Sequence, residues 1–135
     1  KDDTPNGWIV TGYPWNDVKT PAHDTFLKAY QAKFKDHPGI SSVWGYSMVK
    51  SIAEGMKKAK STEAEKLVAA FRNLQVDTPF GKIMYRAEDN QSTVGSFVGR
   101  TKNVGGNGVM VDSQYRDGMN YQPSIEEVKK LRPAD

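Results

Sequence analysis

The stretch from Gly39 to Thr62 constrains the fold of this 135-residue chain more than any other segment. Apolar residues recur in it at helical spacing, which predicts a long helix near Val43–Ala59 with one buried face. A short β-prone segment, Trp8–Tyr13, comes before it, followed by a helix over Pro21–Lys35 that carries an apolar stripe. The length is that of one ordinary domain.

Further elements follow the long helix. A capping box formed by Thr62 and Glu65 predicts a helix over Glu63–Asn73. The hydrophobic period then changes to two, which predicts a strand around Ile83–Tyr85, and a turn follows at Glu88–Asn90.

The last third of the chain contains two further β-prone segments, Thr93–Val98 and Gly108–Val111. The glycine-rich stretch Lys102–Asn107 between them is expected to be a loop, as a hairpin or a linker. A second capping box, Ser124 with Glu127, predicts a short tail helix that reaches Leu131.

Composition excludes several function classes. The net charge is only +3, from 19 basic and 16 acidic residues that are interspersed, so nucleic acid is not an expected partner. The absence of cysteine excludes disulfides and thiolate metal sites. No apolar run approaches the ~20 residues that span a bilayer. The chain begins Lys1-Asp2-Asp3 without a methionine, and we expect it to be a piece of a longer protein.

No set of residues predicts catalysis. The two histidines, His23 and His37, have no second ligand at metal-binding spacing. Asp77, Glu88 and Asp89 lie in sequences typical of turns, where their side chains satisfy local backbone groups. The serines lack a Gly-x-Ser-x-Gly nucleophile elbow. We therefore expect no catalytic residue, no metal site and no cofactor.

Aromatic residues near the ends of predicted elements are the better candidates for a site. Tyr13, Trp15, Trp44 and Tyr46 combine a large apolar face with a polar group, which suits a cleft for a small ligand. Packing at the rim of a core is the alternative for each of them.

The order and spacing of four segments resemble one family. They are Gly7-Trp-Ile-Val-Thr-Gly-Tyr13, Gly39–Thr62, Asp77-Thr-Pro-Phe-Gly-Lys-Ile83 and Glu88-Asp-Asn-Gln91. Together they resemble the C-terminal third of bacterial periplasmic binding proteins of the branched-chain amino acid type, the solute receptors of ABC importers. The resemblance covers roughly Gly7 to Gly108 and carries nothing onto Tyr115–Asp135.

The resemblance implies an α/β fold: a fragment of the two-lobed type I periplasmic-binding-protein fold, with parallel sheets flanked by helices and lobes joined by hinge crossings. Residues 1–38 would be part of the C-terminal lobe, 39–92 part of the N-terminal lobe, and 93–135 a return to the C-terminal lobe with a tail. The crossings would lie at Pro38–Ser42 and Gln91–Gly95.

The function implied is capture of a small solute in the interlobe cleft, either a branched-chain amino acid or a small aromatic or aliphatic carboxylate, for delivery to the membrane permease of an ABC transporter. The protein would be periplasmic and not an enzyme. The segment after Tyr13 and the helix start at Trp44–Tyr46 match positions that can face the cleft, while the main anchoring residues would lie upstream.

Other partners and functions remain open at this point. The missing N-terminal portion of the same protein, or a second copy, would cover apolar surface that this chain leaves exposed. A ligand-sensing module of a receptor with the same ancestry, or a small free-standing α/β enzyme, is the alternative function.

Overall fold

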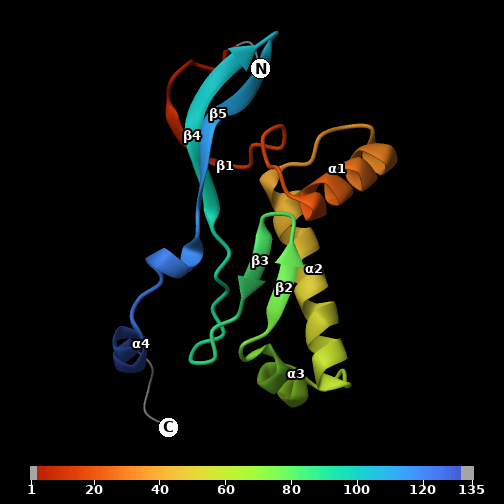
Figure 1. Ribbon diagram of the computed structural model, residues 1–135, viewed down its shortest axis with the longest axis vertical. Coiled ribbons are helices and arrows are strands. Elements are labelled where there is room, and N and C mark those ends of the chain that lie inside the picture. The colour runs from red at the N-terminus through yellow and green to blue at the C-terminus, as the bar shows by residue number, and fades with distance from the viewer. Residues whose placement is uncertain (1–2, 132–135) are drawn as a thin grey trace.

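The computed structural model describes residues 3–131 and contains two parts along its long axis (Figure 1). Three strands and one helix form the upper part, and two strands and two helices form most of the lower part. In chain order the elements are β1 (Ile9–Gly12), α1 (Pro21–Phe34), α2 (Ile40–Ala59), α3 (Ala64–Phe71), β2 (Gln75–Thr78), β3 (Gly81–Met84), β4 (Ser96–Val104), β5 (Asn107–Arg116), a 3-10 turn η1 (Gly118–Tyr121) and α4 (Ile125–Leu131).

The upper sheet has the order β1-β4-β5 and is antiparallel throughout. β4 and β5 form a long hairpin whose register runs from Ser96↔Arg116 to Val104↔Asn107. Only Gly105 and Gly106 remain as the turn, and both have positive φ values of 57° and 77°. The predicted loop over Lys102–Asn107 is therefore a hairpin in which both strands continue almost to the tip.

The lower sheet is the β2–β3 hairpin. Every pairing between the described strands is antiparallel, so the parallel sheets expected of the whole two-lobed fold are not formed by these strands with one another. In the two hairpins, β2–β3 and β4–β5, the reason is connection length, since a two-residue turn can join only antiparallel neighbours. The α/β class itself is confirmed by the mixture of helices and sheet and by the structural relatives described below.

Helix starts were predicted with mixed success. Thr20 caps α1, since its Oγ1 accepts a hydrogen bond from the His23 amide at 3.0 Å and Pro21 follows at the first helical position. The Ser124–Glu127 capping box is also confirmed by reciprocal bonds of 2.8 and 3.2 Å. The box expected at Thr62 is wrong, because α3 begins after Glu63 with no side-chain cap.

Helix α2 begins at Ile40, three residues earlier than predicted, and so includes part of the expected crossing Pro38–Ser42. Its buried face consists of small or short side chains, namely Val43, Ser47, Ser51 and Gly55. A Cβ atom at Gly55 would lie 2.6 Å from the Phe71 ring, so glycine there permits close packing of α3 on α2.

Most of the apolar stripe predicted to be buried on α2 lies on the outside. That stripe is Val43, Tyr46, Val49, Ile52, Ala53 and Met56, and of these only Val43 is buried. Val49 is 67% exposed and Ile52 is 40% exposed. The small residues of α2 allow α3 and the β2–β3 hairpin to approach on the other face, and no described segment of this chain covers the larger apolar side chains.

The main core joins the two parts of the molecule. Phe80, in the β2–β3 turn, is 6% exposed and packs between elements of the upper part. Its ring centroid lies 5.2 Å from that of Phe97 in β4 and 5.6 Å from that of Tyr13 after β1. The Thr20 hydroxyl also donates a 2.9 Å hydrogen bond to the Pro79 carbonyl. The full buried cluster is Val18, Phe26, Val43, Phe80, Phe97 and Met110.

Candidate functional site

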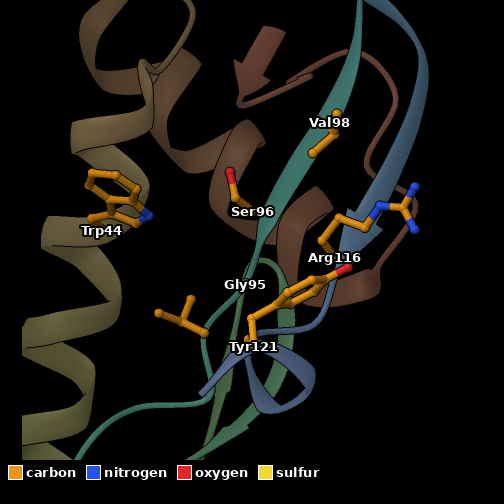
Figure 2. A pocket seen from close by; sticks show the side chains of 8 residues that line it. Trp44, Gly95, Ser96, Val98, Arg116 and Tyr121 are labelled. Atoms are coloured by element: carbon orange, nitrogen blue, oxygen red, sulfur yellow. The ribbon is translucent and has the colours of Figure 1, made fainter. Parts of the chain in front are cut away.

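A cavity with a volume of about 760 Å³ forms an open groove between α2 and the strand β4 (Figure 2). We call it the Trp44 groove. It takes one wall from the lower part and the other from the upper sheet and the segment after it. Its lining residues are Trp44, Val94, Gly95, Ser96, Val98, Arg116, Gly118 and Tyr121.

The Trp44 groove is mainly apolar, with aromatic rings from two different elements. Trp44 is 50% exposed on α2, and Tyr121 is 68% exposed at the end of η1. Ser96 supplies a hydroxyl group. Arg116 extends away from Trp44 in Figure 2, and its guanidinium donates a 3.0 Å hydrogen bond to Gln114 Oε1. Such walls suit the apolar or planar portion of a small solute.

Tyr46 lies on nearly the opposite side of α2 from Trp44. The two residues are two positions apart, and an α-helix turns by about 100° per residue, so their side chains point about 200° apart. Tyr46 lines a smaller cavity of about 240 Å³ between α1 and α2, which we call the Tyr46 groove. There its ring centroid lies 5.0 Å from that of Phe26. The Tyr46 groove is completed by Thr25, Ala29, Tyr30, Lys33 and Phe34.

Tyr13 and Trp15 line neither groove. The Tyr13 hydroxyl lies 2.5 Å from Nε2 of His23, and burial raises the pKa of Tyr13 to about 12. Trp15 stacks on His37 with the ring centroids 3.7 Å apart and the planes at 15°. The structure therefore does not bring the four predicted aromatic residues into one cavity.

Sequence reasoning missed most residues of the Trp44 groove. Val94, Ser96 and Val98 belong to or precede β4, and Tyr121 comes from η1. No local motif marks these positions. Only the pairing of Ser96 with Arg116, which brings the segments before β4 and after β5 together, makes them neighbours.

His23 is a buried titratable group next to Tyr13, and only 1% of it is exposed. Burial lowers the pKa of His23 below its ordinary value of 6.5, because a protonated imidazole would lose its hydration. Lys19 acts in the same direction, while Asp24 and the Val18 carbonyl oppose it. The imidazole is thus held neutral in the core.

We expect the free energy of unfolding to fall as the pH drops below about 6.5, because the unfolded chain then binds a proton that the folded His23 does not accept. Urea titrations at about pH 7.5 and about pH 5 measure this loss. His23→Gln should make it smaller. The control His37→Gln removes the exposed histidine and should preserve the loss. An equal loss in the His23→Gln variant would contradict the assignment.

Neither a metal site nor a membrane span is found among the described residues. Over 3–131, no group of three or more His, Asp or Glu is placed to hold a metal ion. No helix in that range has both the length and the apolar character needed to cross a membrane.

A model of the periplasmic binding protein family matches residues 1–107. The chain belongs to the periplasmic binding protein family. The match extends through α1, α2, α3 and β4 and thus includes most of the described elements. The resemblance inferred from the sequence is confirmed.

Individual relatives of this periplasmic binding protein support the same family assignment. The leucine-, isoleucine-, valine-, threonine- and alanine-binding protein of Pseudomonas aeruginosa is 32% identical over 81 residues, which are 60% of this chain and 21% of the relative. An ABC-type branched-chain amino acid transporter protein from Rhodopseudomonas palustris CGA009 has a TM-score of 0.70 and 26% identity, over 81% of this chain and 31% of its own.

A more distant structure shows the fold alone. The solute binding protein of an ABC transporter from Rhodopseudomonas palustris BisB5, solved with 3,4-dihydroxybenzoic acid, has a TM-score of 0.71 at 21% identity, over 83% of this chain and 31% of its own. The present chain therefore spans between about a fifth and a third of these relatives. They are binding proteins of transporters rather than enzymes.

Proposed function

We propose that this chain works as part of a two-lobed periplasmic receptor that captures a small solute between its lobes for an ABC importer. The observation that carries the proposal is the family match over residues 1–107. In this proposal residues 1–38 and 93–135 belong to the C-terminal lobe, and residues 39–92 belong to the N-terminal lobe. Support for this division comes from the separate sheets, since β1, β4 and β5 fall in the first set of residues and β2 and β3 in the second, while α4 lies at the level of the lower part (Figure 1).

The proposed solute is a branched-chain amino acid or a small aromatic or aliphatic carboxylate. The name of the Pseudomonas aeruginosa relative supports the first class. The Trp44 groove is compatible with either, because its walls are mainly apolar and its volume of about 760 Å³ falls in the range typical of small-molecule sites. Polar groups for the carboxylate would come from outside this chain.

Trp44 is the predicted site residue that we propose contacts the solute. It lies at the boundary between the two parts, where a cleft that closes by hinge motion would bury it. Tyr46 faces the other groove, so one small solute cannot contact both side chains in this arrangement. Tyr13 and Trp15 would act only through packing, Tyr13 against the main core and Trp15 on His37.

Trp44→Ala should weaken solute binding by about 2 kcal/mol or more, or roughly 30-fold, as truncation of a central aromatic contact commonly does. Tyr46→Ala is the matched control, since the two side chains have similar exposure, 50% and 44%. Calorimetry on the longer polypeptide that we propose contains this chain, with leucine, isoleucine, valine, 4-hydroxybenzoate and 3,4-dihydroxybenzoate as probes, measures both effects.

Two results would count against this proposal in different ways. A loss of affinity in Tyr46→Ala but not in Trp44→Ala would move the solute to the Tyr46 groove. Absence of binding by any amino acid or aromatic acid, in a protein that melts cooperatively, would argue against solute capture itself.

A further inference from the structure

The segment Tyr115–Pro123 runs from the end of the upper sheet down to the lower part, where α4 follows it (Figure 1). It lies beyond residue 107, where the match to the family ends. It also supplies one wall of the Trp44 groove through Arg116, Gly118 and Tyr121. Its contacts with the rest of the chain concentrate on one other segment, Ser92–Ser96, which connects the lower part to β4.

Two hydrogen bonds join these segments next to the last strand pair, Ser96↔Arg116. The amide of Gly95 donates to the Tyr115 hydroxyl at 2.7 Å. Further down, Nε2 of Gln122 donates to the Ser92 carbonyl at 2.9 Å. The connection from the lower part to β4 is therefore held by a second segment at Ser92 and at Gly95.

Two glycines allow the backbones of these segments to approach closely. A Cβ atom at Gly95 would lie 1.9 Å from the Arg116 carbonyl oxygen. A Cβ atom at Gly118 would lie 2.5 Å from the Val94 carbonyl oxygen. Since both obstacles are backbone atoms, any side chain at either position would push the segments apart.

The lower end of the segment is fixed by Arg86, which follows β3. Nη1 of Arg86 donates a 2.8 Å hydrogen bond to the Pro123 carbonyl. Asp89 holds the same guanidinium in an ion pair, and the two side chains are only 14% and 4% exposed. A partly buried arginine that is fixed by a carboxylate is a firm donor, so the segment ends on a rigid point of the lower part.

We propose that Tyr115–Pro123 is a strap that sets the angle between the upper and lower parts, and with it the width of the Trp44 groove. A rotation of the lower part about Ser92–Ser96 would have to separate the glycine contacts or break the bonds to Ser92 and Pro123. The strap thus restricts the hinge motion that the proposed solute capture needs, and its release would let the groove open.

Spin labels test the strap without any solute. The chain contains no cysteine, so Lys28→Cys on α1 and Ala69→Cys on α3, both exposed, give one defined label pair. The labelled chain is diluted with an excess of unlabelled chain, so that only the two labels within one chain contribute. Pulsed electron–electron double resonance, which measures the distance between two spin labels, should then show one narrow distance. Gly118→Val should give a shifted or roughly twofold broader distribution, as expected when a hinge is released.

The matched control is Gly45→Val on α2, because a Cβ atom at Gly45 meets nothing within 4 Å. If Gly118→Val does not fold, the double variant Tyr115→Phe with Gln122→Ala removes two strap hydrogen bonds and should broaden the distribution in the same direction. A distribution as narrow as in the Gly45→Val control, in either strap variant, would overturn the proposal. Because no ligand is added, that result would leave the proposed solute capture to its own test.

Discussion

Phe80→Ala should lower the free energy of unfolding by about 3–5 kcal/mol, the usual cost of truncating a phenylalanine in a packed core. Phe80 is 6% exposed, and its ring contacts aromatic rings of Tyr13, Phe97 and Tyr115. It also comes from the lower hairpin while its neighbours belong to the upper part, so the variant loses a contact that holds the two parts together. A loss of this size is a large fraction of the ~5–15 kcal/mol that stabilises an ordinary domain.

Urea denaturation followed by fluorescence measures the effect of Phe80→Ala. Phe34→Ala is the matched control, since it removes the same ring from a position that is 55% exposed, and it should cost about 1 kcal/mol or less. Similar losses in the two variants would mean that the Phe80 turn does not anchor the lower hairpin in the upper core.

The chain on its own should associate with itself, to give an apparent mass above 15.0 kDa that rises with concentration. Helices α2 and α3 expose several large apolar side chains, and exposed apolar surface commonly associates with a partner. The exposed fractions are 61% for Met48, 67% for Val49, 40% for Ile52 and 49% for Val68. In the longer receptor that we propose, the missing N-terminal portion would cover this surface, and in the isolated chain a second copy would.

Light scattering over a range of concentrations tests this expectation. Val49→Lys with Ile52→Lys should restore a monomer, since two charges would have to be buried on association. Ala32→Lys with Thr62→Lys adds the same charge at exposed positions elsewhere and should leave association unchanged. If the wild-type chain keeps an apparent mass of 15.0 kDa at every concentration, the exposed apolar side chains of α2 and α3 do not drive association, and the expectation is wrong.

Local signals in the sequence were sufficient for most elements. Thr20 with Pro21 marks the start of α1 because the cap and the proline act on their immediate neighbours. The Ser124–Glu127 box marks α4 for the same reason. The strand near Ile83 was also predicted, since alternation of buried and exposed residues is a property of the strand itself.

Features that depend on contacts between residues far apart in the sequence could not be predicted from local signals. The face of α2 that is buried is decided by Phe71, which packs on Gly55, so the small residues lie inside and Val49 lies outside. Trp44 and Tyr46 face different grooves because they are two positions apart on one helix, and this separation follows from helix geometry alone. The other wall of the Trp44 groove depends on the strand register around Ser96, which no local pattern specifies.

The turn of the β4–β5 hairpin is a position where the chain can accept inserted residues. This turn, Gly105–Gly106, lies at the far upper end of the molecule in Figure 1, away from α2 and from the strap. Residues added between these two glycines would extend into solvent and touch neither groove, because exposed hairpin tips accommodate insertions. This hairpin can therefore become longer or shorter without altering the proposed solute capture. A reporter peptide inserted there would label the protein and leave both grooves intact.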